Sequence, residues 1–314
     1  MEKDLLYKSR SFSSCILAAY QLMSKNLWTL IKSTWLPVLL CAVLLAIFMA
    51  VNLPNEEVVA AGAAHFALYI GMLAACLIGI IFTDLWAFSR LMSMLNEESR
   101  RWNLGRAAWL LLHVVAITAV LTLAAIGIGR LGHARLVQAA VDHYWLVLGL
   151  VLAATFVVSL LLMPLTYVAM KYLNECDMRF WHDLASAYRT GLRRLSFIFI
   201  TLFISGIIVS MLMSIVMLPY LTLTSAYYTS LMGYLMGDPS DLPGYFFVLF
   251  IATAVAVFFL LWYVEAFLVV VAYFMYGSIE KRREEQRNAR LEEQQQPPLP
   301  TTELTDIPPI NLQS

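Results

Sequence analysis

Glu265 is the one charged residue in the apolar stretch LLWYVEAFLVVVAY, residues 261–274, and no Lys, Arg or His accompanies it there. If this stretch crosses a bilayer, counting back from Tyr276 at 1.5 Å per residue places the acid roughly 16 Å inside the membrane. A charged acid near the bilayer centre costs about 2.5–3.5 kcal/mol on insertion scales. An ionisable residue at that depth is therefore a functional hypothesis in its own right.

Three interpretations of Glu265 follow from its surroundings. The acid is protonated and hydrogen-bonds a neighbouring helix, or it faces a hydrated cavity and belongs to an ion or proton pathway, or it takes part in catalysis. Ser159 and Ser205 lie at comparable depth in two other apolar stretches and are candidate partners. The residue types alone leave these interpretations open.

Asp84 and His113 form a second candidate group, because each lies near the basic end of its own apolar stretch. An Asp–His pair is one prediction, since a carboxylate and an imidazole at equal depth attract each other. The alternative is that Asp84 reaches Arg90 and leaves His113 by itself. The predicted substrate or proton pathway therefore consists of Glu265, Asp84, His113, Ser159 and Ser205.

Motifs of known enzymes are incomplete in this chain. GIGRLG (127–132) spells a dinucleotide motif but follows no strand pattern. EESRRW (97–102) differs from the EExxxR motif of intramembrane proteases, because Trp102 stands at the Arg position. In NECDMRFWHD (174–183) we expect Glu175 and Arg179 to form an i,i+4 ion pair rather than a zinc site. We expect no catalytic residue, no metal ion and no cofactor.

The elements that position these residues are apolar stretches long enough to span a bilayer. Of the 314 residues, 61% are hydrophobic and 13% are charged, far from the about 25% charge of soluble domains. A helix needs about 20 apolar residues to cross the hydrocarbon core. We therefore predict an all-α, polytopic membrane protein. Its six predicted spans are residues 33–53, 65–89, 107–129, 144–170, 195–222 and 245–276.

Basic residues give the chain a direction. Of its 21 Lys and Arg residues, 19 lie in the two ends of the chain and in connections 90–106 and 171–194. The other two, Arg130 and Arg135, lie in one connection on the opposite side. Because positive residues remain on the cytosolic side, both termini are predicted to be cytosolic, in the cytoplasmic membrane.

The same pattern divides the chain into three predicted regions. Residues 1–30 form a cytosolic amphipathic segment, and residues 31–279 form the transmembrane domain. Residues 280–314 form a charged and then Pro-rich cytosolic tail, which we expect to be disordered at its end.

Two sequence patterns repeat within the predicted cytosolic segments. FSSCILAAYQLMSK (12–25) resembles FWHDLASAYRTGLR (180–193), and LNEESRR (95–101) resembles LNECDMR (173–179). These repeats predict three tandem transmembrane hairpins preceded by cytosolic lead-in helices, an arrangement common in transporters and in other bundles.

The lead-in segments have an apolar stripe at helical spacing and bases elsewhere. We expect them to lie in the membrane interface near anionic headgroups, with docking onto the bundle as the alternative. The expected partner is the lipid bilayer, with no nucleic acid, and a homo-oligomer or a membrane protein partner stays open. The predicted lipid-interface residues are Lys25, Arg189, Arg193 and Arg194.

The pattern Phe-x3-Leu-x2-Ala-Tyr ahead of a span resembles a loose group of six-span bacterial membrane domains. That group includes the membrane region attached to some glycerophosphodiester phosphodiesterases. The resemblance implies an all-helical protein of the cytoplasmic membrane and supplies no catalytic residues, because no phosphodiesterase domain is present. It bears on fold and location rather than on chemistry.

Our leading functional hypothesis is a non-enzymatic membrane protein, a transporter-like bundle or an accessory subunit in which Glu265 is the working residue. The alternative is a membrane scaffold that recruits lipid or protein through its cytosolic helices and tail. An intramembrane enzyme ranks third, because no nucleophile–base arrangement is visible in the sequence.

Overall fold

The structure is a computed structural model that describes residues 6–53, 63–142, 144–237 and 242–295. Every regular element in these ranges is an α-helix, which confirms the predicted all-α class. The helices are α2 (Phe12–Val51), α4 (Ala63–Asn96), α5 (Arg100–Asp142), α6 (Tyr144–Leu162), α7 (Pro164–Asn174), α8 (Phe180–Arg193), α9 (Leu195–Leu235) and α10 (Phe246–Gln295).

Within the described ranges, six helical segments are long and apolar enough to cross a membrane, so the chain is a multi-pass membrane protein. They correspond to the six predicted spans and form the hairpins α2–α4, α5–α6 and α9–α10. The fourth span divides at Pro164, which begins α7, because proline has no N–H to continue the helical ladder of α6.

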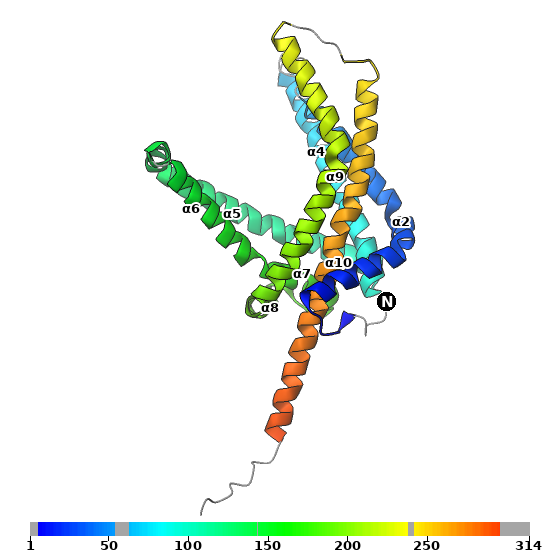
Figure 1. Cartoon of the computed structure of the whole chain (residues 1–314), viewed down its shortest axis with the longest axis vertical. Coiled ribbons are helices and arrows are strands. Elements are labelled where there is room, and N and C mark those ends of the chain that lie inside the picture. Colours follow the sequence, from blue (N-terminus) through cyan, green and yellow to red (C-terminus); the bar gives the residue numbers. More distant parts are fainter. Residues whose placement is uncertain (1–5, 54–62, 143, 238–241, 296–314) are drawn as a thin grey trace, which may run out of the picture.

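The two lead-in segments differ in how they join their spans. Residues 12–25 continue without a break into the first span, so that α2 is a single helix of 40 residues. This helix changes direction between its lead-in and spanning parts, whereas α8 is a separate short helix that ends before α9 begins (Figure 1).

The packed part of the molecule consists of α2, α4, α9 and α10, with α2 and α9 both lying against α10 (Figure 1). Small buried residues, Ala42 and Ala46 on α2 and Ala254 on α10, let the helices approach closely. An interhelical hydrogen bond joins Thr34 Oγ1 to Tyr263 Oη at 3.1 Å. Because lipid offers no hydrophobic drive between helices, this close fit and the polar bond hold the pair together.

The middle hairpin, α5–α6, extends away from the packed helices (Figure 1). Large apolar side chains such as Leu112, Val115, Leu152 and Phe156 are exposed along it. It joins the remainder of the molecule where α5 contacts α4 and α7.

Four segments with most of the basic residues gather at one end of the molecule, which we call the basic end (Figure 1). They are residues 6–12, 90–106, 171–194 and 277–295. There the N-terminal segment binds α10: the backbone N–H of Arg10 donates to Ser278 Oγ at 3.0 Å, and Ser278 Oγ donates to the Arg10 carbonyl at 3.0 Å. Gly277 lies directly against Leu6. The segment before α2 is therefore fixed to the sixth span.

The structure refines the predicted regions of the chain. The boundaries at residues 30 and 279 fall within the continuous helices α2 and α10. Residues 296–314, where we expect a disordered tail, lie outside the described residues.

Candidate functional site

Asp84 on α4 and Trp262 on α10 meet across the space between their helices. The indole Nε1 of Trp262 donates a hydrogen bond to Asp84 Oδ1 at 3.0 Å. The two residues are 178 positions apart in the sequence and belong to different hairpins. A buried or membrane-embedded indole N–H needs an acceptor, and here the acceptor is an intramembrane carboxylate.

Glu265 lies three residues beyond Trp262 on α10, almost one helical turn nearer the basic end. Its side chain is exposed at the surface of the chain, and it has no hydrogen bond or ion pair within the described residues. Because Asp84 bonds Trp262, Glu265 lies about one helical turn along α10 from the Asp84 contact. Two acids from different hairpins therefore lie in the same part of the packed helices.

The predicted partners of Glu265 lie elsewhere. Ser159 is exposed on α6 and donates to the Thr155 carbonyl at 2.8 Å. Ser205 is buried on α9 and donates to the Thr201 carbonyl at 2.8 Å. Each hydroxyl thus bonds the turn before it on its own helix, a common arrangement for Ser in membrane helices, and neither bonds Glu265.

The predicted Asp84–His113 pair is wrong, and so is its alternative, Asp84–Arg90. Asp84 bonds Trp262, whereas His113 is buried on α5 with its Nδ1 near the Trp109 carbonyl. The imidazole packs 4.3 Å from the Phe180 ring of α8, centroid to centroid. Its role in the structure is to seat α8 against α5. Asp84 and His113 do not pair, because α5 diverges from the packed helices beyond its first turns (Figure 1).

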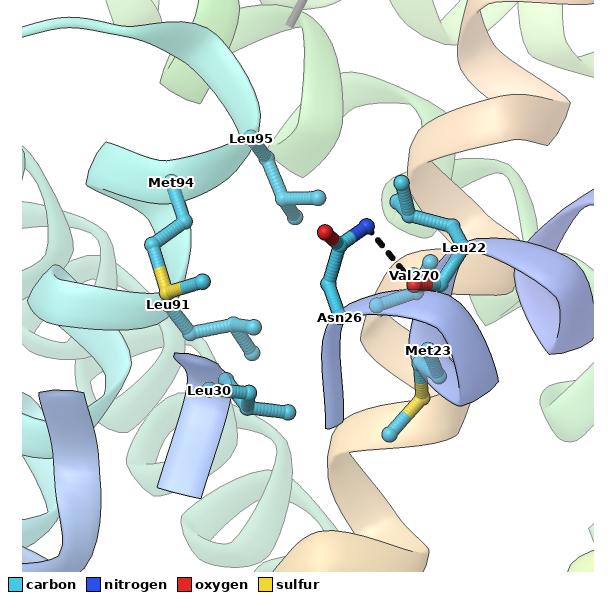
Figure 2. A pocket seen from close by; sticks show the side chains of 8 residues that line it. All are labelled: Leu22, Met23, Asn26, Leu30, Leu91, Met94, Leu95 and Val270. Atoms are coloured by element: carbon cyan, nitrogen blue, oxygen red, sulfur yellow. Dashed lines mark hydrogen bonds between the residues drawn. The ribbon is translucent and has the colours of Figure 1, made fainter. Parts of the chain in front are cut away.

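An apolar cavity of about 250 Å³ lies between α2, α4 and α10, on the basic side of the two acids. Figure 2 shows Asn26 of α2 between Leu95 of α4 and Val270 of α10. The amide of Asn26 donates to the Leu22 carbonyl at 3.0 Å and is the one polar side chain among the lining residues. The cavity therefore suits an apolar group rather than an ion.

The two Leu-Asn-Glu motifs meet at the basic end. Asn96 and Asn103 exchange amide hydrogen bonds of 2.8 and 3.1 Å, and Asn96 also donates to the Leu173 carbonyl at 3.4 Å. In turn, Tyr273 of α10 donates to the Leu95 carbonyl at 2.8 Å. The Asn96 bond to Leu173 thus joins the two motifs, and the Tyr273 bond joins the first of them to the sixth span.

Arg106 at the beginning of α5 binds the end of α7. Its guanidinium lies between the rings of Trp102 and Tyr172, 4.6 Å from each centroid. It donates to the carbonyl of Tyr172 and to those of Glu175 and Cys176, the last two at 2.6 Å. A cation at a helix C-terminus satisfies carbonyls that have no partner within the helix.

A network of acids, tyrosines and one lysine joins α7 to α10. Glu175 Oε1 accepts from Tyr276 Oη at 2.9 Å and lies 3.4 Å from Lys171 Nζ. Glu280 accepts from Tyr167 and lies 3.5 Å from the same Lys171. The predicted Glu175–Arg179 pair is therefore wrong, because α7 ends at Asn174 and the acid turns back to Lys171.

The predicted lipid-interface residues all lie at the basic end. Lys25, Arg189 and Arg193 are exposed, and Arg194 follows α8 as its C-cap. The amphipathic α8 carries an exposed Trp181. Their contact with anionic headgroups stays a prediction.

The beginning of α8 is held by Asp183. Its carboxylate bonds His182 Nδ1 at 2.8 Å and accepts from the Arg179 backbone N–H at 2.9 Å. The bond from His182 is the larger influence and, with the Arg179 bond, lowers the pKa of Asp183 from its ordinary value.

Sequence reasoning missed Trp262, Arg106 and the two tyrosines Tyr167 and Tyr276. Trp262 carried a usable signal, because an i,i+3 spacing places it near Glu265 on α10. Arg106 carried none, since its partners are backbone carbonyls of a segment 66 and more residues away. The tyrosines carried no signal, because the acids that they bind lie 113 and 101 residues away in the sequence.

Comparison with family models, with curated proteins and with solved structures finds no match to this chain. The resemblance to membrane domains of some glycerophosphodiester phosphodiesterases therefore stays a prediction. Within the described residues, no group of three or more His, Cys, Asp or Glu side chains is placed to hold a metal ion.

Proposed function

We propose that the protein is a non-enzymatic, transporter-like membrane protein in which Asp84 and Glu265 bind a proton or a small cation. One observation carries this proposal. Two carboxylates from different hairpins meet at α10, because Asp84 bonds Trp262 and Glu265 follows Trp262 by three residues. Neither acid has an ion pair among the described residues.

The electrostatics of such a pair favour a bound positive charge. Two carboxylates in a medium of low dielectric repel each other, so a proton or a cation between them lowers the free energy. Asp84 is held in place by Trp262, whereas Glu265 is exposed and has no hydrogen bond in the described structure. Glu265 is therefore the acid that accepts and releases the charge, and Asp84 positions it.

Proton flux into proteoliposomes tests this function. Purified protein is reconstituted with a pH-sensitive dye inside, and a potassium gradient with valinomycin drives proton entry. We expect Glu265→Gln to reduce the flux at least tenfold and Asp84→Asn to reduce it as well. The matched control is Glu285→Gln, which makes the same change on the exposed extension of α10 and is expected to leave the flux unchanged.

Two outcomes would contradict the proposal. One is a flux through Glu265→Gln equal to that of the wild type, accompanied by a change in thermal stability alone. The other is a wild-type flux no greater than that of empty liposomes, tested with sodium and potassium as well as protons.

A membrane scaffold is the second candidate function, and the exposed surface of the basic end favours it. There α8 presents Trp181, with 65% of its surface exposed, beside exposed bases, and α10 continues well past the level where α7 ends. If the protein is a scaffold, no flux is expected in either liposome experiment. The Glu265→Gln variant should then retain all the contacts of the wild type.

A further inference from the structure

We propose that a groove at the basic end binds the headgroup of an anionic phospholipid. The groove is open to solvent, has a volume of about 900 Å³, and lies between α7, the end of α8, the extension of α10 and Tyr7. This volume falls within the range of about 300–1,000 Å³ typical of ligand sites. The site is separate from the acid pair and does not depend on the proposed transport function.

The acids that line the groove have partners, whereas several of its arginines have no ion pair among the described residues. Its three acids all have partners: Glu175 and Glu280 share Lys171, and Glu284 lies 2.9 Å from Lys281. The tyrosine hydroxyls of the neighbouring network also donate to Glu175 and Glu280. The carboxylates are thus paired with groups of the protein itself.

The cations are in excess over these acids. Arg283 lies 3.8 Å from Glu280, at the outer limit of an ion pair. Arg193, Arg287 and Arg290 also line the groove, and within the described residues none of them has an ion pair. Three guanidinium groups therefore face the groove with unused donors, and guanidinium matches phosphate with two parallel hydrogen bonds.

The position of the groove identifies the source of the phosphate. Lys171 lies near the end of the fourth span, and Arg193 is two residues before Leu195, where the fifth span begins. The remaining arginines lie on the charged extension of α10, within about four helical turns of Tyr276. The groove thus begins beside the ends of two spans, where basic residues attract the phosphates of anionic lipid.

Lipid binding by the purified full-length chain in detergent tests the assignment. The probes are phosphatidylglycerol, phosphatidylcholine with the same acyl chains, and glycerol 1-phosphate, and binding is measured by native mass spectrometry together with thermal unfolding. We expect phosphatidylglycerol to bind at least tenfold more tightly than phosphatidylcholine and to raise the unfolding temperature.

The variant Arg193→Gln/Arg287→Gln/Arg290→Gln is expected to weaken phosphatidylglycerol binding at least tenfold. All three side chains are exposed, so the fold should persist. The control removes three exposed arginines of the same end that do not line the groove and should change binding less than twofold. It consists of Arg100→Gln, Arg101→Gln and Arg179→Gln.

Three results would overturn the proposal. Wild-type binding of phosphatidylglycerol by the groove variant would show that these arginines do not bind the lipid. An equal loss in the control would show that general surface charge is responsible. Equal protection by glycerol 1-phosphate at the same concentration would assign the groove to a soluble anion.

Discussion

The packed helices and the middle hairpin are all apolar enough to cross a membrane but differ in how they associate. Where α2 meets α10, alanines allow close approach and Thr34 bonds Tyr263. Along α5 and α6 the exposed side chains are large and branched, such as Leu112 and Leu152, and the hairpin stands apart (Figure 1). Apolar character therefore places a helix in lipid, whereas small residues and polar bonds decide which helices pack.

The two regions also differ in where their polar contacts lie. In the packed part, hydrogen bonds occur at several depths, from Asp84–Trp262 to Tyr273–Leu95. The middle hairpin is joined at the basic end, through Asn96–Asn103 and Arg106. The contrast predicts that the hairpin depends on a few residues at its base.

The largest effect is expected for Arg106→Ala, which removes the donor of several carbonyls at the end of α7. Leaving these groups without a partner should lower the free energy of unfolding by about 3 kcal/mol. Thermal unfolding in detergent measures the loss, and cysteine cross-linking between the bases of α5 and α7 measures the separation.

Arg101→Ala is the control, because Arg101 is exposed on the same helix and has no hydrogen bond or ion pair to α7 within the described residues. An Arg106→Ala protein with wild-type stability and cross-linking would show that the hairpin is held by apolar packing after all.

A moderate effect is expected for Gly277→Ala in the packed part. An added methyl group would overlap the side chain and the backbone carbonyl of Leu6, so the N-terminal segment would have to move. Overpacking of this kind costs about 1–3 kcal/mol. Differential scanning calorimetry or chemical unfolding in micelles provides the measurement.

The same substitution in the middle hairpin sharpens the comparison. Gly149 on α6 has no atom within 4 Å of an added methyl group, so Gly149→Ala should leave stability unchanged or raise it slightly. If Gly149→Ala destabilises the protein as much as Gly277→Ala, then α6 packs against a neighbour and the hairpin is not splayed in the membrane.

The smallest effect concerns pH and Asp183 at the beginning of α8. Its bonds to His182 and to the Arg179 N–H lower the pKa of Asp183, so they contribute stability above the ordinary carboxyl pKa of about 3.9. That contribution is lost as the pH falls through the lowered value. Hydrogen-exchange protection of the first turn of α8 should therefore decrease at acidic pH.

Asp183→Asn removes the titrating group and should abolish this pH dependence. Hydrogen-exchange protection at the C-terminal end of α8 should stay unchanged. Equal loss of protection in the variant and the wild type would assign the effect to another group.

Local pattern was sufficient to predict the spans. A run of about 20 apolar residues has few alternatives to a membrane helix, because every backbone polar group in lipid must be satisfied within the segment. The same reasoning identified Glu265 and Asp84 as unusual, since a charge in such a run is expensive wherever the helices pack. It did not predict their surroundings, because Ser159, Ser205 and His113 bond within their own regions.

What the sequence by itself determined was therefore the membrane class, the six spans, the repeat and the identity of the two acids, all of which depend on composition and short spacing. The tertiary structure decided that Asp84 bonds Trp262 and that Arg106 binds the end of α7. It also decided that the middle hairpin stands apart (Figure 1). These features depend on which helix faces which, and in lipid that choice follows from shape and single polar contacts between residues far apart in the chain.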